Sequence, residues 1–313
     1  MKKISSVVLI TVFFVLFLFS NSFSQTYQFL KLDLSARAAA LGGTFVSNND
    51  DPDVIFYNPA GLSLLEKNPI SFSFVKHLLD INLASLSYST YWNGVGRIGA
   101  AISYINYGTF TQADENGNKI GQFGAGETAF ILGYSNILGQ NFYYGANVKY
   151  IYSSIADRSS SAIALDLGLH YAIPSALTDV GFSILNAGTQ ITEYYSTRED
   201  LPLDIVLGAS KKMEHLPLRL SLDFHDLNAH KSNFFKKFNA FSLGAEFYLS
   251  KVLRLRFGYN NAIRKDLTIG SFAGLAGFNV GVGIVISKYE FDYGFSSMGS
   301  VGGLHRVSVS TSL

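Results

Sequence analysis

From about residue 70 onward, apolar residues recur at every second position rather than every third or fourth. The segment 216–225 is an example, with apolar residues at Leu216, Leu218, Leu220, Leu222 and Phe224. The same alternation marks 161–173, 238–249 and 252–260. Because successive side chains of a β-strand point to opposite faces, each segment is predicted to be a strand with one apolar face and one polar or small face.

Alternating segments and the turn signals between them predict 14 strands, an even number, as bacterial single-chain barrels have. Asn116-Gly117 is the strongest turn signal, because this dipeptide suits positive φ at both central positions of a tight hairpin. Further short connections are predicted at 138–141 and 250–251. The predicted strands are 70–76, 82–91, 97–107, 126–136, 141–153, 161–173, 179–187, 203–211, 216–225, 238–249, 252–260, 276–287, 288–295 and 304–313.

Three arguments choose a membrane barrel over a soluble β-sandwich, which alternates in the same way. A barrel of this many strands is too wide for its own side chains to fill, so the apolar face must point outward into lipid. Tyr and Phe recur near predicted strand ends, as aromatic girdles require. An N-terminal export signal supplies the compartment. We therefore expect an all-β protein, a transmembrane antiparallel barrel.

The N-terminus has the pattern of a cleaved signal peptide. Lys2 and Lys3 precede an apolar run over 7–19, and Ser22 and Ser24 suit signal peptidase, which prefers small residues before the cut. The run is shorter than the roughly 20 residues that span a bilayer. We predict a signal peptide over 1–24, a plug over 25–69 and a barrel over 70–313, in the outer membrane of a Gram-negative-type envelope.

Composition excludes several classes of function. Without residues 1–24 the chain loses two lysines and no acid, which leaves 22 Lys and Arg against 23 Asp and Glu, so nothing favours nucleic acid as a partner. The absence of cysteine excludes disulfides, thiolate metal sites and a cysteine nucleophile. Charged residues make up only 15%, against about 25% in ordinary soluble domains.

The segment 25–69 does not alternate and is predicted to form a plug inside the barrel. Its residues 36–41 are helix formers that end at Gly42-Gly43, and 48–53 is a polar loop. Asp50-Asp51 and the later Asn58-Pro59-Ala60-Gly61 form the hatch motif, to which we assign a structural role.

These residues resemble the N-terminal hatch of the FadL-like transporters, which are 14-stranded barrels. The opening residues 27–30 and 35–43 look more narrowly like the PorV/PorQ family of the type IX secretion system. Segments 104–108, 186–192, 201–202, 214–221 and 258–260 are most similar to the PorQ branch. The match covers most of the chain after the signal peptide, although this chain ends in Leu313 where many outer-membrane barrels end in an aromatic residue.

The resemblance implies a component of the attachment complex that receives type IX cargo and fixes it to the cell surface. Its implied partners are outer-membrane lipid, a PorZ-like surface protein, the sortase and a PorV-like barrel. It implies no enzyme activity, no catalytic residue and no cofactor. The alternative function is a FadL-like channel for hydrophobic small molecules. Candidate partner loops are 107–126 and the Lys-rich stretch 230–237.

The sequence itself contains no pattern that indicates catalysis. The six histidines have no metal-ligand spacing, and His225-Asp226 lacks a nucleophile motif. His170 and His225 are interpreted as lumen residues on strands. Asp114, Asn116 and Asn118 imitate the start of a calcium loop, but a hairpin turn explains them better. Further charged residues are predicted inside the lumen: Arg219, Asp223, Glu246, Arg254 and Arg256.

Overall fold

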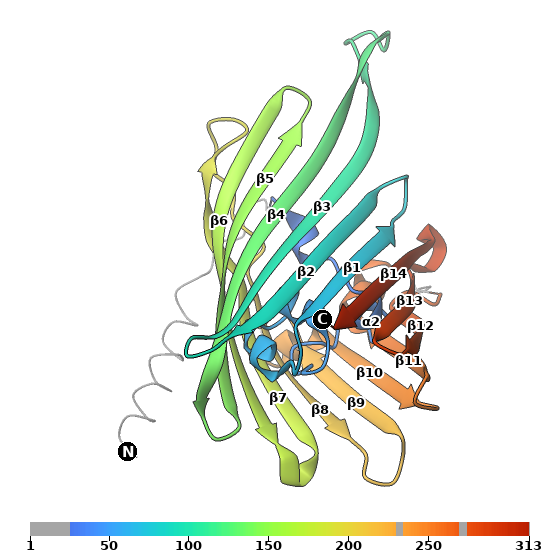
Figure 1. Cartoon of the computed structure of the whole chain (residues 1–313). Coiled ribbons are helices and arrows are strands. Elements are labelled where there is room, and N and C mark those ends of the chain that lie inside the picture. Colours follow the sequence, from blue (N-terminus) through green and yellow to red (C-terminus); the bar gives the residue numbers. More distant parts are fainter. Residues whose placement is uncertain (1–25, 230–233, 269–273, 313) are drawn as a thin grey trace.

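The computed structural model describes residues 26–229, 234–268 and 274–312. Fourteen strands form one closed antiparallel barrel in which each strand pairs with its neighbours in the sequence, and the last strand pairs with the first (Figure 1). The predicted fold class is therefore confirmed. The predicted signal peptide lies outside the described residues.

The strands follow the predicted segments in order. Their bounds are β1 Pro69–Lys76, β2 Asn82–Trp92, β3 Gly96–Ala113, β4 Lys119–Gly139, β5 Phe142–Ile155, β6 Arg158–Ile173, β7 Thr178–Thr192, β8 Asp204–Lys212, β9 Leu218–Phe224, β10 Phe241–Tyr248, β11 Leu253–Asn260, β12 Phe278–Ile286, β13 Tyr289–Ser297 and β14 Gly303–Ser312. Closure rests on eight paired positions, from Pro69 with Ser312 to Lys76 with His305.

The largest departure from prediction is the segment 107–126, which was expected to be a loop. Instead β3 and β4 continue beyond the rest of the wall as a tall hairpin, with a bulge between Asn106 and Thr109 (Figure 1). Its turn also differs, because only Gly117 has positive φ (84°). The Asp114 carboxylate accepts bonds from Asn116 N, Asn118 N and Asn118 Nδ2, so this cluster serves a turn.

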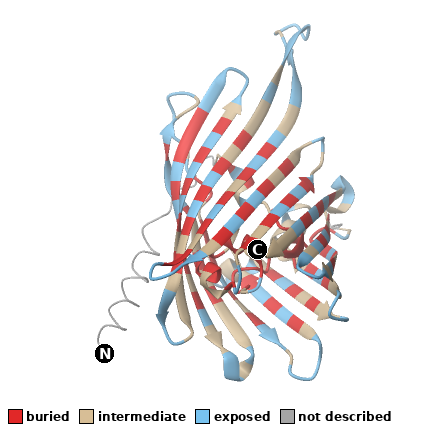
Figure 2. Cartoon of the chain, in the orientation of Figure 1, coloured by how far each residue is buried: buried red, intermediate tan, exposed pale blue. Residues whose placement is uncertain are grey.

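Apolar side chains of the strands are exposed on the outer face and many polar side chains are buried inside, the reverse of a soluble domain. Buried and exposed residues alternate along the strands (Figure 2). Leu132 is 67% exposed on the outer face, whereas Lys149 and Asp166 are buried inside and paired at 2.9 Å. An apolar outer face beside a charged interior is stable in lipid and unstable in water. No helix in the described residues is both long and apolar enough to cross a membrane.

The two rims of the barrel differ. One rim carries the short turns, such as Gln140-Asn141 and Ser287-Lys288, and the other carries the tall hairpin and the long connections after β7, β9 and β11. Because outer-membrane barrels have short periplasmic turns and long extracellular loops, we assign the second rim to the cell exterior.

The segment before β1 lies inside the barrel (Figure 1). It contains four short helices, η1 Gln28–Lys31, α2 Ala36–Ala40, η2 Pro52–Phe56 and η3 Pro59–Leu64. Helix α2 begins where the Ser35 side chain accepts a bond from Ala38 N, and it ends before Gly42 and Gly43, whose φ values are 73° and 85°. Glycine tolerates this left-handed conformation, so the chain can turn sharply there. We call residues 26–68 the hatch.

Candidate functional site: the hatch and the lumen

The hatch spans the lumen from one wall to the other. Helix α2 lies against β11 to β14, and η3 lies against β3 to β6. The site therefore consists of the hatch, the inner wall and the spaces that they leave.

Asn58 of the hatch motif is fully buried and joins three parts of the chain. Its Nδ2 donates to Val46 O at 2.7 Å and to Leu169 O of β6 at 3.0 Å, and its Oδ1 accepts from Ala60 N at 3.1 Å. The side chain thus caps η3 and fixes it to the wall. A short amide that serves as both donor and acceptor explains why asparagine occupies this position.

The next residues of the motif approach the wall closely. A side chain at Gly145 would overlap the backbone of Pro59 and Ala60, and one at Gly168 would overlap the Asn58 side chain and Ala60 N. Ala60 O also accepts a bond from the Ser135 hydroxyl at 3.1 Å. Glycines on the inner wall therefore leave room for the hatch backbone.

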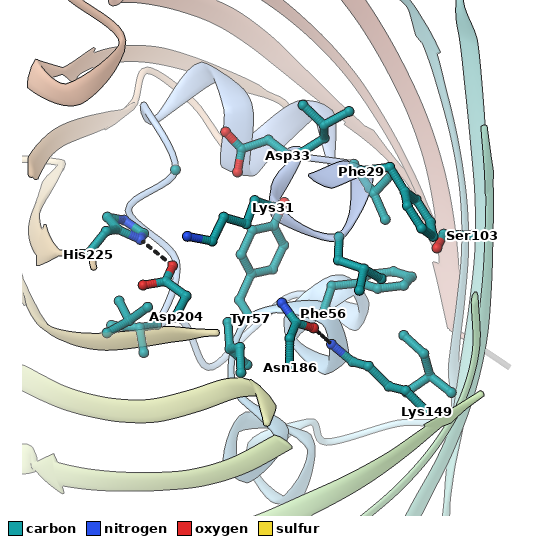
Figure 3. A pocket seen from close by; sticks show the side chains of 18 of the residues that line it. Phe29, Lys31, Asp33, Phe56, Tyr57, Ser103, Lys149, Asn186, Asp204 and His225 are labelled. Atoms are coloured by element: carbon teal, nitrogen blue, oxygen red, sulfur yellow. Dashed lines mark hydrogen bonds and ion pairs between the residues drawn. The ribbon is translucent and has the colours of Figure 1, made fainter. Parts of the chain in front are cut away.

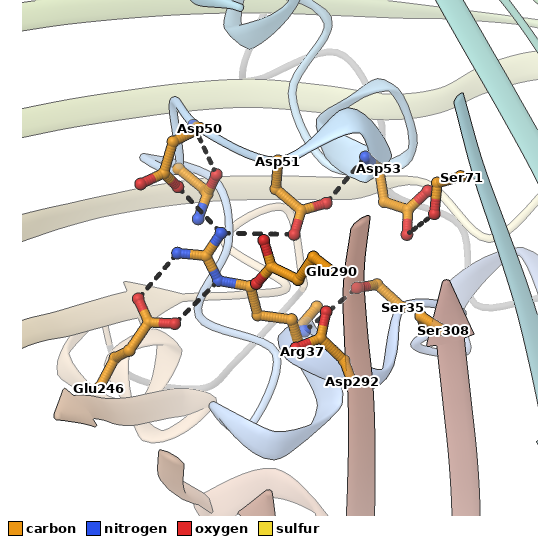
Figure 4. Close-up of polar contacts among 12 residues, drawn as sticks. Ser35, Arg37, Asp50, Asp51, Asp53, Ser71, Glu246, Glu290, Asp292 and Ser308 are labelled. Carbon is orange, nitrogen blue, oxygen red and sulfur yellow. Dashed lines mark hydrogen bonds and ion pairs between the residues drawn. The ribbon is translucent and has the colours of Figure 1, made fainter. Parts of the chain in front are cut away.

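The two acids of the motif take part in an ionic cluster around the buried guanidinium of Arg37, with Asp51 buried and Asp50 exposed at its edge (Figure 4). Arg37 of α2 lies 3.0 Å from Asp50 and 3.4 Å from Asp51, measured from Nη1. Its Nε and Nη2 donate to the two carboxylate oxygens of Glu246 on β10, at 3.0 and 2.7 Å. Bidentate geometry of this kind makes a strong charge-assisted contact.

The wall extends this cluster as predicted from the sequence. Arg256 donates to Glu246 at 2.7 Å and to Glu290 at 3.2 Å, and it also contacts Asp292. Arg254 lies 2.5 Å from Glu290. Charged residues of β10, β11 and β13 therefore form one network, which reaches the hatch through the contact between Glu246 and Arg37.

The pKa values of two neighbouring carboxyls in the hatch, Asp50 and Asp51, are shifted in opposite directions. Burial alone would raise the pKa of Asp50, but the guanidiniums of Arg219 and Arg37 hold that pKa well below its usual value. Burial and the nearby Asp53 raise the pKa of Asp51 well above its usual value. Asp53 itself accepts bonds from Ser87 at 2.8 Å and Ser71 at 3.1 Å. Asp50 therefore adds a negative charge between Arg37 and Arg219, beside the Glu246 carboxylate that Arg37 contacts in bidentate fashion.

The extracellular half of the lumen is filled by an apolar cluster. The hatch contributes Tyr27, Phe29 and Leu34, and the loop after β7 contributes Leu201. Inward-facing wall residues complete it: Val75, Leu83, Ile105, Ala129, Ile151, Ala162 and Ala164. The hatch therefore occupies the apolar part of the lumen.

A small cavity of about 70 Å³ remains beside the hatch (Figure 3). Its lining includes Lys31, Asp33, Lys149, Asp204 and His225. An apolar cavity of roughly 150 Å³ holds a molecule of benzene. This space is both smaller and more charged, so it suits water or a small polar molecule.

His225 links the wall to this cavity. The predicted strand 216–225 ends one residue earlier, at Phe224, so His225 begins the loop after β9. Its Nδ1 lies 3.4 Å from Asp204 Oδ2, and Asp226 N donates to Asp204 Oδ1 at 2.7 Å. Burial would lower the pKa of His225, but the hydrogen bond and charge of Asp204 raise it to about 9. His170, by contrast, lies inside the wall on β6, 3.0 Å from Asp179.

A second space of about 410 Å³ opens at the extracellular rim. Aromatic and aliphatic side chains of Phe123, Ile155, Tyr194 and Tyr195 line it, together with polar residues such as Arg158. We call this space the mouth pocket. Below it, the Tyr194 hydroxyl contacts the Ser153 hydroxyl, and the hydroxyls of Tyr27 and Ser160 are hydrogen-bonded at 2.5 Å. These contacts separate the mouth pocket from the lumen.

The wall itself is irregular near this pocket. Strand β7 bulges at 185–186, where the pairing with β6 shifts between Leu165 and Leu167 and Asn186 has φ of 61°. Beyond Leu185, β7 pairs with β6 but no longer with β8. The loop 193–203 then folds inward, with Leu201 only 4% exposed.

Sequence reasoning missed two residues of the site. Arg37 appeared only as part of a helix-forming run, although a charge among alanines was a signal of a buried partner. Asp223 was placed on the inner face, but its role was not predicted. Its carboxylate accepts Phe45 N at 2.8 Å and Val46 N at 3.0 Å, which fixes the hatch loop. Among the described residues, no three His, Asp or Glu side chains gather as a metal ion requires.

The comparisons with known proteins concern the fold. No protein-family model matches the chain, and no curated protein sequence matches it. Solved structures similar to it include the toluene transporter TbuX of Ralstonia pickettii (TM-score 0.58, 14% identity, 88% of this chain and 96% of that one). The toluene transporter TodX of Pseudomonas putida gives a TM-score of 0.58 at 14% identity, over 89% and 98% of the two chains. A FadL homologue of Pseudomonas aeruginosa gives 0.56 at 9% identity, over 89% and 98%. The chain therefore has the fold of the FadL-type outer-membrane channels, and this fold fits an outer-membrane protein.

Proposed function

We propose that this chain is a closed outer-membrane barrel of the type IX secretion system that anchors partners of the cell-surface attachment complex. The sequence resemblance to the PorV/PorQ family, strongest toward the PorQ branch, points to this system. Type IX partners, a PorZ-like surface protein and the sortase among them, belong to the proposal.

The observation that carries the proposal is the sealed lumen. Ligand pockets for small molecules commonly measure about 300–1,000 Å³ and are mostly apolar. Here the hatch fills the apolar half of the lumen and the Arg37 cluster fixes it. The cavity beside Lys31 and His225 measures about 70 Å³, and a space of about 480 Å³ lies on the periplasmic side, between the hatch and β12 to β14. A barrel closed in this way suits a scaffold better than an open path.

The rim supports the same function. The β3–β4 hairpin rises above the other strands (Figure 1), and the connections after β7, β9 and β11 lie on the same rim. A stable protein interface buries about 800 Å² per partner. Such loops could supply that area without opening the barrel.

Deletion of the chain in its native host tests this function. We expect surface retention of secreted cargo to fall and unattached cargo to accumulate in the medium, while export across the inner membrane continues. Complementation with the intact chain is the control. Unchanged surface attachment in the deletion strain would contradict the proposal.

A second function, a channel for hydrophobic small molecules, is favoured by a separate observation. The similar solved structures are transporters of toluene and a FadL homologue, and these comparisons favour the channel over the attachment complex. The aromatic mouth pocket and the bulge of β7 at 185–186 are features that such a path could use. Conduction would require the hatch segment around Tyr27 and Phe29 to move.

Uptake of labelled toluene by cells that carry the barrel in their outer membrane tests the channel. A working channel predicts faster uptake than in cells with an empty vector. Substitution Tyr27→Ala, which removes the hydroxyl contact with Ser160 and opens the apolar cluster, should raise uptake further. Uptake equal to the empty vector in both strains would eliminate this function.

A further inference from the structure

A row of aromatic side chains crosses the outer wall at the extracellular ends of β9 to β12. Ring centroids lie 5.2 Å apart for Phe224 and Phe238, 6.0 Å for Phe241 and Tyr259, and 5.1 Å for Tyr259 and Phe278. These residues come from strands and from the loop between β9 and β10, so the row is built by the fold. We call it the outer aromatic row.

The alternation of the strands places this row outside the barrel. The neighbouring residues Ser242 and Asn279 are buried on the inner face, and a side chain at Gly258 would overlap the hatch. Residues one position away must therefore face outward. Phe278 is 45% exposed there. Aromatic rings at this level are typical of the boundary between lipid tails and headgroups.

Two short helices in the extracellular loops beside the row carry basic side chains. Helix η5 (Phe234–Asn239) carries Lys236 and Lys237, and helix α3 (Asn261–Asp266) carries Arg264 and Lys265. The Arg264 guanidinium lies 5.9 Å from the centre of the Phe278 ring. Asn261 Nδ2 donates to Asn239 O at 2.8 Å, which joins the two loops into one surface.

The rest of the extracellular rim has the opposite charge. The hairpin and loops after β3, β5 and β7 carry a series of acids: Asp114, Glu115, Asp157, Glu193, Glu199 and Asp200. Of the four cations beside the row, Lys236 and Lys265 are exposed. The same hairpin and loops also carry Lys119, Arg158 and Arg198, so acids outnumber bases there by six to three, whereas η5 and α3 carry four cations and one acid, Asp266. The excess of basic charge in the described part of the rim thus lies where the outer aromatic row meets the membrane.

We propose that this surface binds a phosphate-bearing lipid of the outer leaflet. The rings contact its acyl chains and glycerol or sugar backbone, while Lys236, Lys237, Arg264 and Lys265 hold the phosphate. Arginine and lysine both bind phosphate oxygens, and clustered basic residues beside a membrane recruit anionic headgroups. The contact orients the basic side of the rim toward lipid and leaves the acidic side open to protein partners.

Native mass spectrometry of the purified full-length barrel in detergent tests the proposal. The probe is lipid A with two phosphates, titrated beside the same lipid with its phosphates removed. We expect the phosphorylated form to bind at least about tenfold more tightly, and 0.5 M salt to reduce this preference because it screens exposed charges. Equal binding of the two lipids would overturn the proposal.

Matched variants locate the site. The quadruple substitution Lys236→Gln, Lys237→Gln, Arg264→Gln and Lys265→Gln should lower the affinity for the phosphorylated lipid by about tenfold or more. The control makes the same change in charge near the periplasmic rim, at Lys67, Lys212, Lys251 and Lys288, and should leave affinity within about twofold. Equal losses in both variants would show non-specific attraction and contradict the site. If the quadruple variant does not fold, the exposed single substitution Lys265→Gln is measured in the same way, and an unchanged affinity would count against the proposal.

Discussion

Arg37 in the hatch and Glu246 in the wall, 209 residues apart in sequence, form a bidentate contact of 3.0 and 2.7 Å. Both side chains are buried, with 1% of each exposed. Arg37→Met would leave Glu246 paired with Arg256 and Asp50 paired with Arg219, but it would remove this buried bidentate contact, and breaking a buried pair costs about 3–5 kcal/mol. We therefore expect Arg37→Met to release the hatch while the barrel, whose hydrogen bonds are between strands, stays closed.

The measurement for Arg37→Met is limited proteolysis of the folded barrel in detergent. Cleavage should appear within residues 26–68 and spare the strands. Arg198→Met is the matched control, because Arg198 is 61% exposed and paired with Glu193 at the surface. Such pairs contribute about 0–1 kcal/mol. An Arg37→Met hatch as resistant as the control would contradict the role of this pair.

Asn58→Ala should also loosen the hatch. The substitution leaves Val46 O, Leu169 O and Ala60 N without their partner, and unsatisfied buried groups cost about 1–3 kcal/mol each. Hydrogen exchange should become faster in residues 46–62 and remain slow in the strands. Asn118→Ala, in the exposed hairpin turn, is the control. Unchanged exchange around Asn58 would show that its bonds do not hold the hatch.

The loop after β9 should lose stability as the pH rises. The pKa of His225 is raised to about 9 by Asp204, above its unfolded value of roughly 6.5. The protonated imidazole therefore stabilises the folded state fully below about pH 6.5, and this contribution is lost as the pH rises through 9. The free energy of unfolding in urea, measured from pH 6 to 10, should fall in this window.

His225→Gln provides the comparison for the pH series. The variant should be less stable at pH 6, and its decline between pH 6.5 and 9 should be smaller than that of the intact chain. His305→Gln, which changes an exposed histidine on β14, should retain the full decline. Parallel curves for the intact chain and His225→Gln would refute the contribution of this ion pair.

Leu132 and Leu138 of β4 allow a test of the membrane-facing wall. Their exposures are nearly equal, 67% and 66%, but Leu132 lies well inside the strand and Leu138 lies beside the periplasmic turn. An arginine near the middle of the bilayer costs about 2–4 kcal/mol, whereas one near the interface costs about 0–1 kcal/mol. Leu132→Arg should therefore lower the free energy of unfolding in liposomes much more than Leu138→Arg. Equal effects would contradict the assigned depth.

Period-two alternation was sufficient to predict the strands, because a wall between lipid and a polar lumen imposes it at every residue. The structure contains the strand 289–297, close to the predicted 288–295, although only Ser287-Lys288 separates it from β12. The extension of β3 and β4 over 107–126 was not predictable, because above the membrane its outer face need not be apolar. Gly121, Gly124 and Gly126 interrupt the pattern there.

The hatch could be located from the sequence but not oriented. Loss of alternation before residue 70 and the helix stop at Gly42-Gly43 mark it as a separate element. Its contacts depend on residues far away, such as Asp223 with Phe45 N and Gly168 with Ala60, and no local pattern encodes such pairings. The inward-facing charges at Glu246 and Arg256 were predictable, because alternate residues of a strand face the lumen. Arg37, which pairs with Glu246, was not predictable in this way.

The most direct test of the proposed function is an affinity purification of the tagged chain from gently solubilised outer membrane of its native host. If the barrel anchors the attachment complex, a surface-exposed protein and the sortase should co-purify with it. Lys251→Met, in an exposed turn of the periplasmic rim, should recover the same partners, which controls for surface substitution. A barrel that purifies alone and carries a bound hydrocarbon or fatty acid would contradict the account and favour the channel.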